Sequence, residues 1–86
     1  MKTIWKFALK FEDVQTIEIP QGGTCLSVKV QHNRPCLWVE IDEGVMFSET
    51  LMIVVVGTGQ AFKKTADMVY IDTVVMGVMV WHFYRA

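Results

Sequence analysis

The sequence lacks a dominant charge of either sign. Eight basic and nine acidic residues give a formal net charge of −1, so no overall electric field draws the chain to a nucleic acid or to an anionic membrane. We therefore expect no duplex nucleic acid and no membrane among its partners.

Long apolar runs are missing as well. The longest run, Val74 to Trp81, is too short to cross a bilayer as a helix. Lysine recurs at every fourth position from Lys2 to Lys10 and interrupts the apolar centre that a signal peptide needs. The sequence predicts a soluble, cytosolic protein.

Cysteine is scarce, and neither Cys25 nor Cys36 belongs to a CxxC pair or to a His/Cys cluster with zinc spacing. We expect no metal and no cofactor. If Gln31 to Pro35 forms a hairpin turn, Cys25 lies opposite a residue near Asp42 and Cys36 opposite one near Gln31. The two are then not cross-strand neighbours, and free thiols packed as small apolar groups are expected.

Apolar residues, in contrast, are plentiful: they make up 52% of a chain of 86 residues. Two domains of half this length would have too little interior, so residues 1–86 are expected to form a single domain. A chain this short cannot hide all of its apolar side chains, and a second copy is the simplest cover for the excess. We expect a homo-oligomer, and the alternative is a monomer that exposes some apolar residues.

Alternation of apolar and polar residues is the main structural signal. It predicts a small all-β sandwich or barrel, mostly antiparallel, with about seven short strands and short meander connections. Hairpins are expected about residues 32–35 and about Met76-Gly77, and aromatic residues at both ends suggest that the first and last strands pair. The expected strands are residues 3–11, 14–19, 24–31, 36–42, 51–56, 68–75 and 78–84.

Leu51 to Val56 is apolar at every position, which predicts a strand that is covered on both faces. The Gly57-Thr58-Gly59 turn follows it. Exposed backbone amides of this turn, the Thr58 hydroxyl and Lys63 or Lys64 could together hold a phosphate or carboxylate. A tight turn that needs the conformational freedom of glycine is the simpler interpretation.

Trp38 shares a strand face with Glu40, which is unusual for a large aromatic residue. It could stack on a base, anchor a protein interface, or cover a second core layer. Catalytic patterns are lacking: Ser48 has no glycine elbow, and His32 and His82 are fifty residues apart. We therefore expect a protein that is not an enzyme.

Four stretches carry a resemblance to a known group: Met1 to Phe7, Pro35 to Trp38, Val56 to Gly59, and the closing aromatic strand. Together they resemble short proteins of unknown function that tailed phages and prophages encode. Relatives usually carry a histidine after the glycine turn, where this chain has Gln60. The resemblance implies a viral origin and a setting in the host cytoplasm.

These patterns lead to a hypothesis: a non-enzymatic phage accessory protein that binds a host component. That component could be a defence protein or a small nucleotide signal. A nucleotide would be held at a subunit boundary by Trp38, Thr58, Gly59 and Lys63 or Lys64. The alternative is a virion or assembly component that pairs through strand edges, and an enzyme acting on a nucleotide is a third possibility.

Overall fold

A computed structural model describes residues 1–86, and seven β-strands are its only regular elements. Because it contains no helix, there is none that could cross a membrane. The strands are β1 (Lys2–Ala8), β2 (Val14–Pro20), β3 (Thr24–Gln31), β4 (Arg34–Asp42), β5 (Ser48–Gly57), β6 (Val69–Met76) and β7 (Met79–Arg85). This confirms the predicted all-β class and the predicted number of strands.

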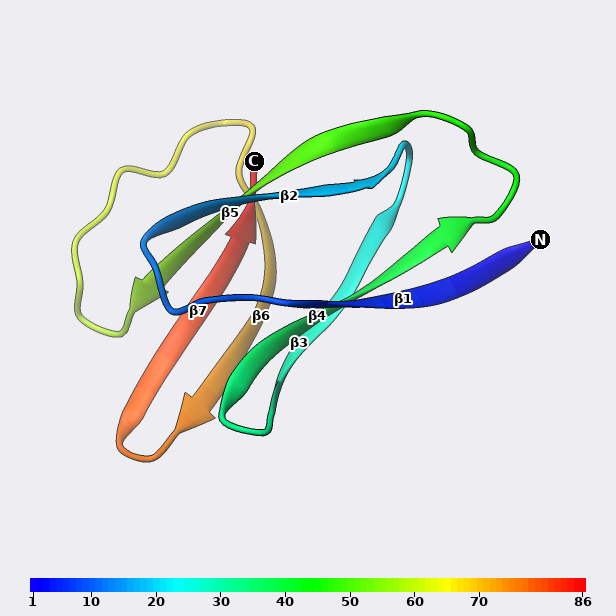
Figure 1. The fold of residues 1–86 in the computed structure, drawn as a ribbon. Helices are drawn as coiled ribbons and strands as arrows, with labels where there is room; N and C mark the ends of the chain where they lie inside the picture. Colours follow the sequence, from blue (N-terminus) through cyan, green and yellow to red (C-terminus); the bar gives the residue numbers. More distant parts are fainter.

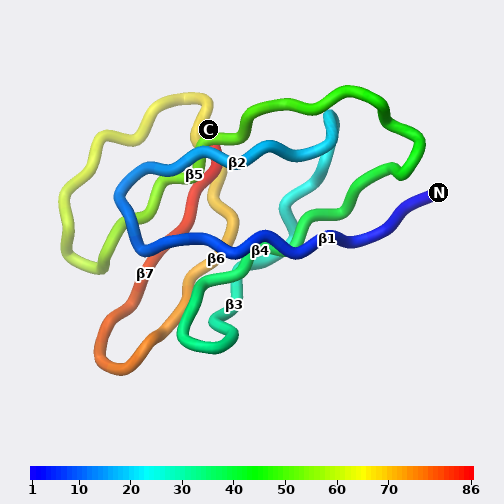
Figure 2. Tube along the Cα trace, viewed as in Figure 1, coloured from blue at the N-terminus to red at the C-terminus, as the bar shows by residue number.

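The strands form two antiparallel sheets, shown in Figure 1. The three-stranded sheet has the order β1-β4-β3, and the four-stranded sheet has the order β2-β5-β7-β6. Figure 2 traces the chain from one sheet to the other between β1 and β2 and again between β2 and β3. The arrangement is a sandwich.

The predicted meander was wrong. Only β3–β4 and β6–β7 are hairpins of consecutive strands, whereas β1 pairs with β4, β2 with β5, and β5 with β7. The predicted pairing of the first and last strands was also wrong, because β7 lies between β5 and β6. The alternation of apolar and polar residues shows which face of a strand is buried. It does not specify which strand, thirty residues away in the sequence, will pair with it.

Both predicted hairpins are present; the first turn is tighter than predicted, and the second is displaced by one residue. His32 and Asn33 have positive φ values of 53° and 62° and form a two-residue turn, so Arg34 and Pro35 already belong to β4. This changes the register: Cys25 pairs with Val39, and Cys36 pairs with Lys29. The cysteines are free and are not cross-strand partners, as expected.

The core lies between the sheets. In β5 the alternation continues, with Leu51, Ile53 and Val55 buried while Met52 is exposed and Val54 is half-buried. The prediction that Leu51 to Val56 is covered on both faces therefore holds only at its end, where Val56 is also buried. The core cluster comprises Leu9, Ile19, Val28, Leu37, Val39, Ile41, Leu51, Ile53, Val55, Val74 and Phe83.

The two sheets meet along β3 and β6, and one side chain joins them there. Asp72 Oδ2 accepts a hydrogen bond from the backbone N–H of Val28 at 3.0 Å and another from Lys29 Nζ at 3.1 Å. The register of β6 shifts between Tyr70 and Asp72, and such a shift re-aims a side chain. The Asp72 carboxylate therefore accepts the Val28 N–H in place of a backbone carbonyl, because β3 and β6 form no backbone ladder with each other.

Candidate functional site

The five residues predicted to bind a ligand lie on different parts of the molecule. Trp38 belongs to β4, and because its neighbours Leu37 and Val39 are buried in the core, it projects from the outer face of the three-stranded sheet. Thr58 and Gly59 follow β5 at the end of the four-stranded sheet. The structure therefore does not bring Trp38 together with the turn within one chain.

The glycine turn already uses most of its backbone donors. The Gly57 N–H donates to Gln60 Oε1 at 3.0 Å, the Thr58 N–H donates to the Val80 carbonyl at 3.1 Å, and the Gln60 N–H donates to the Gly57 carbonyl at 3.0 Å. Gly59 has a φ of +86°, which explains why glycine stands there. The turn is thus a closed structural element with a single spare amide, that of Gly59.

The side chain of Thr58 is also occupied. Its Oγ1 lies 2.7 Å from His82 Nε2, while His82 Nδ1 lies 2.9 Å from Thr73 Oγ1. The chain of contacts ends at the Tyr70 hydroxyl, 2.5 Å from Thr73 Oγ1. Both nitrogens of His82 therefore have a hydroxyl partner, and the histidine links the turn to β6. Sequence reasoning missed this network because the pairing of β6 with β7 determines it.

Lys63 and Lys64 lie in the loop between β5 and β6. Both are exposed and neither forms an ion pair. Phe62 holds the loop against β7, with its ring centroid 5.5 Å from that of Tyr84. The lysines are available to a binding partner, but no other predicted ligand residue converges on them.

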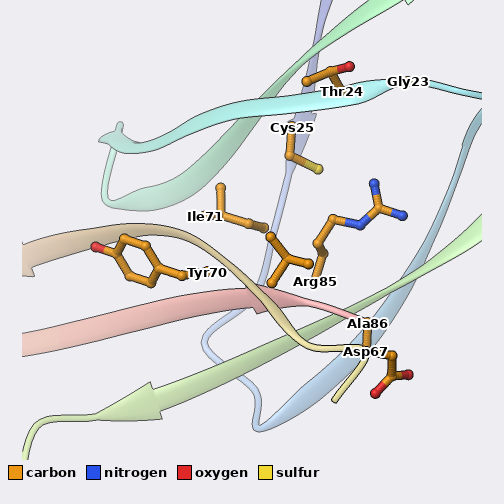
Figure 3. A pocket seen from close by; sticks show the side chains of 9 residues that line it. Gly23, Thr24, Cys25, Asp67, Tyr70, Ile71, Arg85 and Ala86 are labelled. Atoms are coloured by element: carbon orange, nitrogen blue, oxygen red, sulfur yellow. The ribbon is translucent and has the colours of Figure 1, made fainter. Parts of the chain in front are cut away.

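The largest hollow lies elsewhere, where β3 and β6 diverge at one end of the sandwich (Figure 3). Its volume is about 480 Å³, within the range of small-ligand pockets. The view shows the side chain of Arg85 rising from β7 towards β3, beside the Cys25 thiol. The lining residues are Gly23, Thr24, Cys25, Asp67, Val69, Tyr70, Ile71, Arg85 and Ala86.

The chemistry of this cleft is limited. Burial raises the pKa of the Cys25 thiol, and the nearby Arg85 guanidinium lowers it by less, so the net shift is upward. Cys25 is therefore a thiol at neutral pH and not the thiolate that a nucleophile requires. In Figure 3 the Tyr70 hydroxyl and the Asp67 carboxylate point away from Arg85. Arg85, which forms no ion pair, is the one cationic group in the cleft.

Exposed apolar side chains are the most unusual feature of the surface. Large apolar residues are exposed at fifteen positions and apolar residues are buried at fourteen, so the surface holds as many as the interior. They are spread over most of the strands and loops, and the highest exposures are those of Val78 in the β6–β7 turn (96%), of Met1 (95%) and of Met46 in the β4–β5 connection (93%). Exposed apolar side chains in this number are typical of interaction surfaces.

Fold and surface together define a class: a small all-β sandwich with many large apolar side chains on its surface. Residues 1–86 match the family model described as a domain of unknown function, DUF7352, and the chain belongs to that family. Comparisons with curated proteins and with solved structures found no match.

Proposed function

We propose that this chain is a non-enzymatic binding protein that assembles as a homo-oligomer through apolar β surface and acts by binding a host component. The observation that carries the proposal is that fifteen large apolar residues are exposed, against fourteen apolar residues that are buried. Exposed apolar area of this extent favours association over a monomeric state. The resemblance to short phage proteins supports a host component as the target.

A host protein is a better candidate than a nucleotide. A nucleotide trap needs spare donors for phosphate near a stacking surface, but the turn amides and the Thr58 hydroxyl are occupied. Trp38 lies on the other sheet. An apolar protein surface, by contrast, needs only the exposed side chains that are already present.

The absence of enzymatic activity is proposed on two observations. Cys25 has a raised pKa, and both nitrogens of His82 are engaged by threonine hydroxyls. Cys25 is therefore not the activated nucleophile that covalent catalysis requires, and His82 is oriented by the Thr73 hydroxyl rather than by the carboxylate of a catalytic triad.

Native mass spectrometry tests the proposal. The purified protein is incubated with an extract of infected cells that carry active defence systems, recovered, and sprayed intact. We expect a multiple of the 9.8 kDa subunit with a retained protein. A retained mass of a few hundred daltons, typical of a nucleotide, would restore the nucleotide trap. An empty monomer would contradict the proposal.

A matched pair of variants sharpens this experiment. Val78→Lys places a charge on the exposed apolar turn, and Lys64→Ala removes a charge from the exposed loop. If apolar surface carries binding, Val78→Lys weakens retention of the partner while Lys64→Ala does not. The reverse pattern would point to a charged ligand at the loop.

The second candidate function is a virion or assembly component. The observation that favours it concerns the four strands that pair on one side only: β3 and β6 contact each other, whereas β1 and β2 are left for strand addition by another phage protein. Detection of the protein in purified particles would support this function, and its absence from them would support the accessory role.

A further inference from the structure

The free edge of β1 presents a defined set of backbone groups. The Glu43 N–H donates to the Met1 carbonyl at 3.0 Å, and the Leu9 N–H donates to the Pro35 carbonyl at 2.8 Å. Both contacts join an odd-numbered residue to β4, and hydrogen-bonded positions alternate along an antiparallel pair. Thr3, Trp5 and Phe7 therefore direct their N–H and C=O groups to β4. The same groups of the even-numbered residues, Lys2 to Ala8, face the free edge.

No strand covers this edge along β1, and the side chain of Gln15 bonds only to the backbone of Lys10 beyond its end. β1 pairs with β4 alone. Of the usual devices that protect an edge, it has two lysines but neither a proline nor a register shift. Trp5 points to the inner side of the sheet, yet it is 48% exposed because the hollow between Thr3, Pro20 and Val45 opens beside it. Ile4, on the outer side, is 54% exposed.

We propose that β1 pairs antiparallel with β1 of a second copy, with Trp5 opposite Trp5 at the twofold axis. In this register residue i lies opposite residue 10 − i, so Lys2 faces Ala8 and Ile4 faces Lys6. Even positions lie opposite even positions, and each such pair exchanges two backbone hydrogen bonds. The tryptophans form the non-hydrogen-bonded pair, where cross-strand side chains approach most closely. The proposal deepens the homo-oligomeric association proposed above and rests on it.

Charge selects this register over its neighbours. A twofold centred on Ile4 sets Lys2 opposite Lys6, and one centred on Lys6 sets Lys6 opposite itself, and like charges directly opposite are destabilising. The register centred on Trp5 avoids both pairings and uses all seven residues of the strand. It also covers the half-exposed indole and joins the two three-stranded sheets into one continuous sheet of six strands, with closed twofold symmetry.

Ile4→Pro is the decisive variant. Because the Ile4 N–H faces the free edge, proline there removes no bond to β4, and proline is tolerated on such edges. It removes two intermolecular hydrogen bonds and introduces a steric clash. We expect at least about a thirtyfold rise in the dissociation constant of the dimer, from roughly one kilocalorie per mole for each lost bond. Ile4→Thr keeps the N–H and is the matched control that remains a dimer.

Sedimentation velocity over a concentration series measures the dissociation constant, and far-UV circular dichroism establishes that each variant is folded. A folded, monomeric Ile4→Pro variant beside a dimeric Ile4→Thr variant supports the proposal. A dimeric Ile4→Pro variant would overturn the β1 interface while leaving homo-oligomerisation in place. A wild-type protein that is monomeric at every concentration would overturn both. A monomeric protein whose β1 edge binds a strand of a different protein would also overturn both the β1 interface and homo-oligomerisation.

Cysteine crosslinking determines the register of the β1–β1 pair without a measurement of the dimer's dissociation constant. In a Cys25→Ser, Cys36→Ser background, single cysteines are placed at positions 4, 5 and 6 and oxidised. Position 5 pairs with itself at a Cα separation of about 4.5 Å, which a disulfide can span. We expect covalent dimers from Trp5→Cys and few from the other two. Preferential crosslinking at position 4 or 6 would refute the register.

Discussion

Asp72 is the single side chain that connects the two sheets where β3 meets β6, so its removal provides a stringent test of the fold. Its Oδ2 accepts from the Val28 N–H, and its Oδ1 accepts from the Thr73 N–H at 2.8 Å. Val28 is fully buried, so its amide has no access to water if the carboxylate is lost. The perturbation is Asp72→Ala.

The expected magnitude follows from these contacts. A buried N–H left without an acceptor costs about 1–3 kcal/mol, and hydrogen bonds to a charged group are worth about 1.5–3 kcal/mol each. The ion pair with Lys29 adds little, because that lysine side chain is 64% exposed. We expect the free energy of unfolding to fall by about 2–4 kcal/mol. A domain of this size has about 4–13 kcal/mol in total, so the melting temperature should fall by roughly 10–25 °C.

Asp72→Asn separates the hydrogen bond from the charge. The amide oxygen can still accept from Val28, so we expect a loss of about 1–2 kcal/mol, roughly half that of the alanine variant. Lys29→Met is the control for the exposed ion pair and should cost less than about 1 kcal/mol.

The pH dependence of stability gives a second signature. Burial raises the pKa of Asp72, but the hydrogen bonds donated by Val28, Thr73 and Lys29 lower it by more, so the net shift is downward. A carboxyl group with a lowered pKa in the folded state stabilises the fold above its unfolded value of about 3.9. This stabilisation disappears as the pH falls from about 4 through the folded-state pKa. The difference between wild type and Asp72→Asn should therefore shrink below about pH 4.

Urea unfolding at several pH values measures both effects. The midpoint should decrease at constant m-value, which reports a change in stability rather than in the surface exposed on unfolding. If Asp72→Ala lowered the unfolding free energy by less than about 1 kcal/mol, the carboxylate would not be what holds β3 to β6.

Three further predictions concern other parts of the surface. Arg85→Gln removes the charge that lowers the pKa of Cys25, so that pKa should rise further and alkylation of Cys25 at pH 8.5 should slow; unchanged rates would show that the guanidinium does not act on the thiol. Thr58→Val removes the hydroxyl that lies 2.7 Å from His82 and should cost about 0.5–1.5 kcal/mol in urea unfolding, whereas a neutral effect would indicate that the network is dispensable. Because the proposed β1 interface gathers Lys2 and Lys6 of both copies, raising ionic strength should tighten the dimer in sedimentation experiments, and weakening by salt would contradict that interface.

Local sequence patterns predicted the strands well because alternation is a local property. The run from Thr24 to Gln31 became β3 over the same residues, and both hairpins were found from their turn residues. The boundaries failed where a turn was tighter than its polar composition suggested, as at Arg34 and Pro35. Two residues with positive φ were enough to reverse the chain, so the rest of the polar segment joined the strand.

The predicted ligand site depended on long-range arrangement, which the sequence pattern could not supply. Trp38 and Thr58 lie on different sheets because β4 pairs with β1 and β3, whereas β5 pairs with β2 and β7. The cleft beside Arg85 was missed for the same reason, since Cys25 and Arg85 are sixty residues apart and approach only where β3 and β6 diverge. No local signal marks such a meeting point.

The two sides of the sandwich are closed in different ways, and this difference explains the exposure of Trp5. On the β3–β6 side, a carboxylate supplies the acceptor that a strand would otherwise provide, so that side needs no further chain. On the side of β1 and β2, the side chain of Gln15 bonds to the backbone of Lys10 beyond the end of β1. No side chain supplies an acceptor along β1 itself, and an inward-facing indole remains half-exposed beside an unpaired edge. One added strand would hydrogen-bond to the free edge of β1, and it would also bury the indole of Trp5 at the same place. The strand that is always present at matching concentration is β1 of another copy.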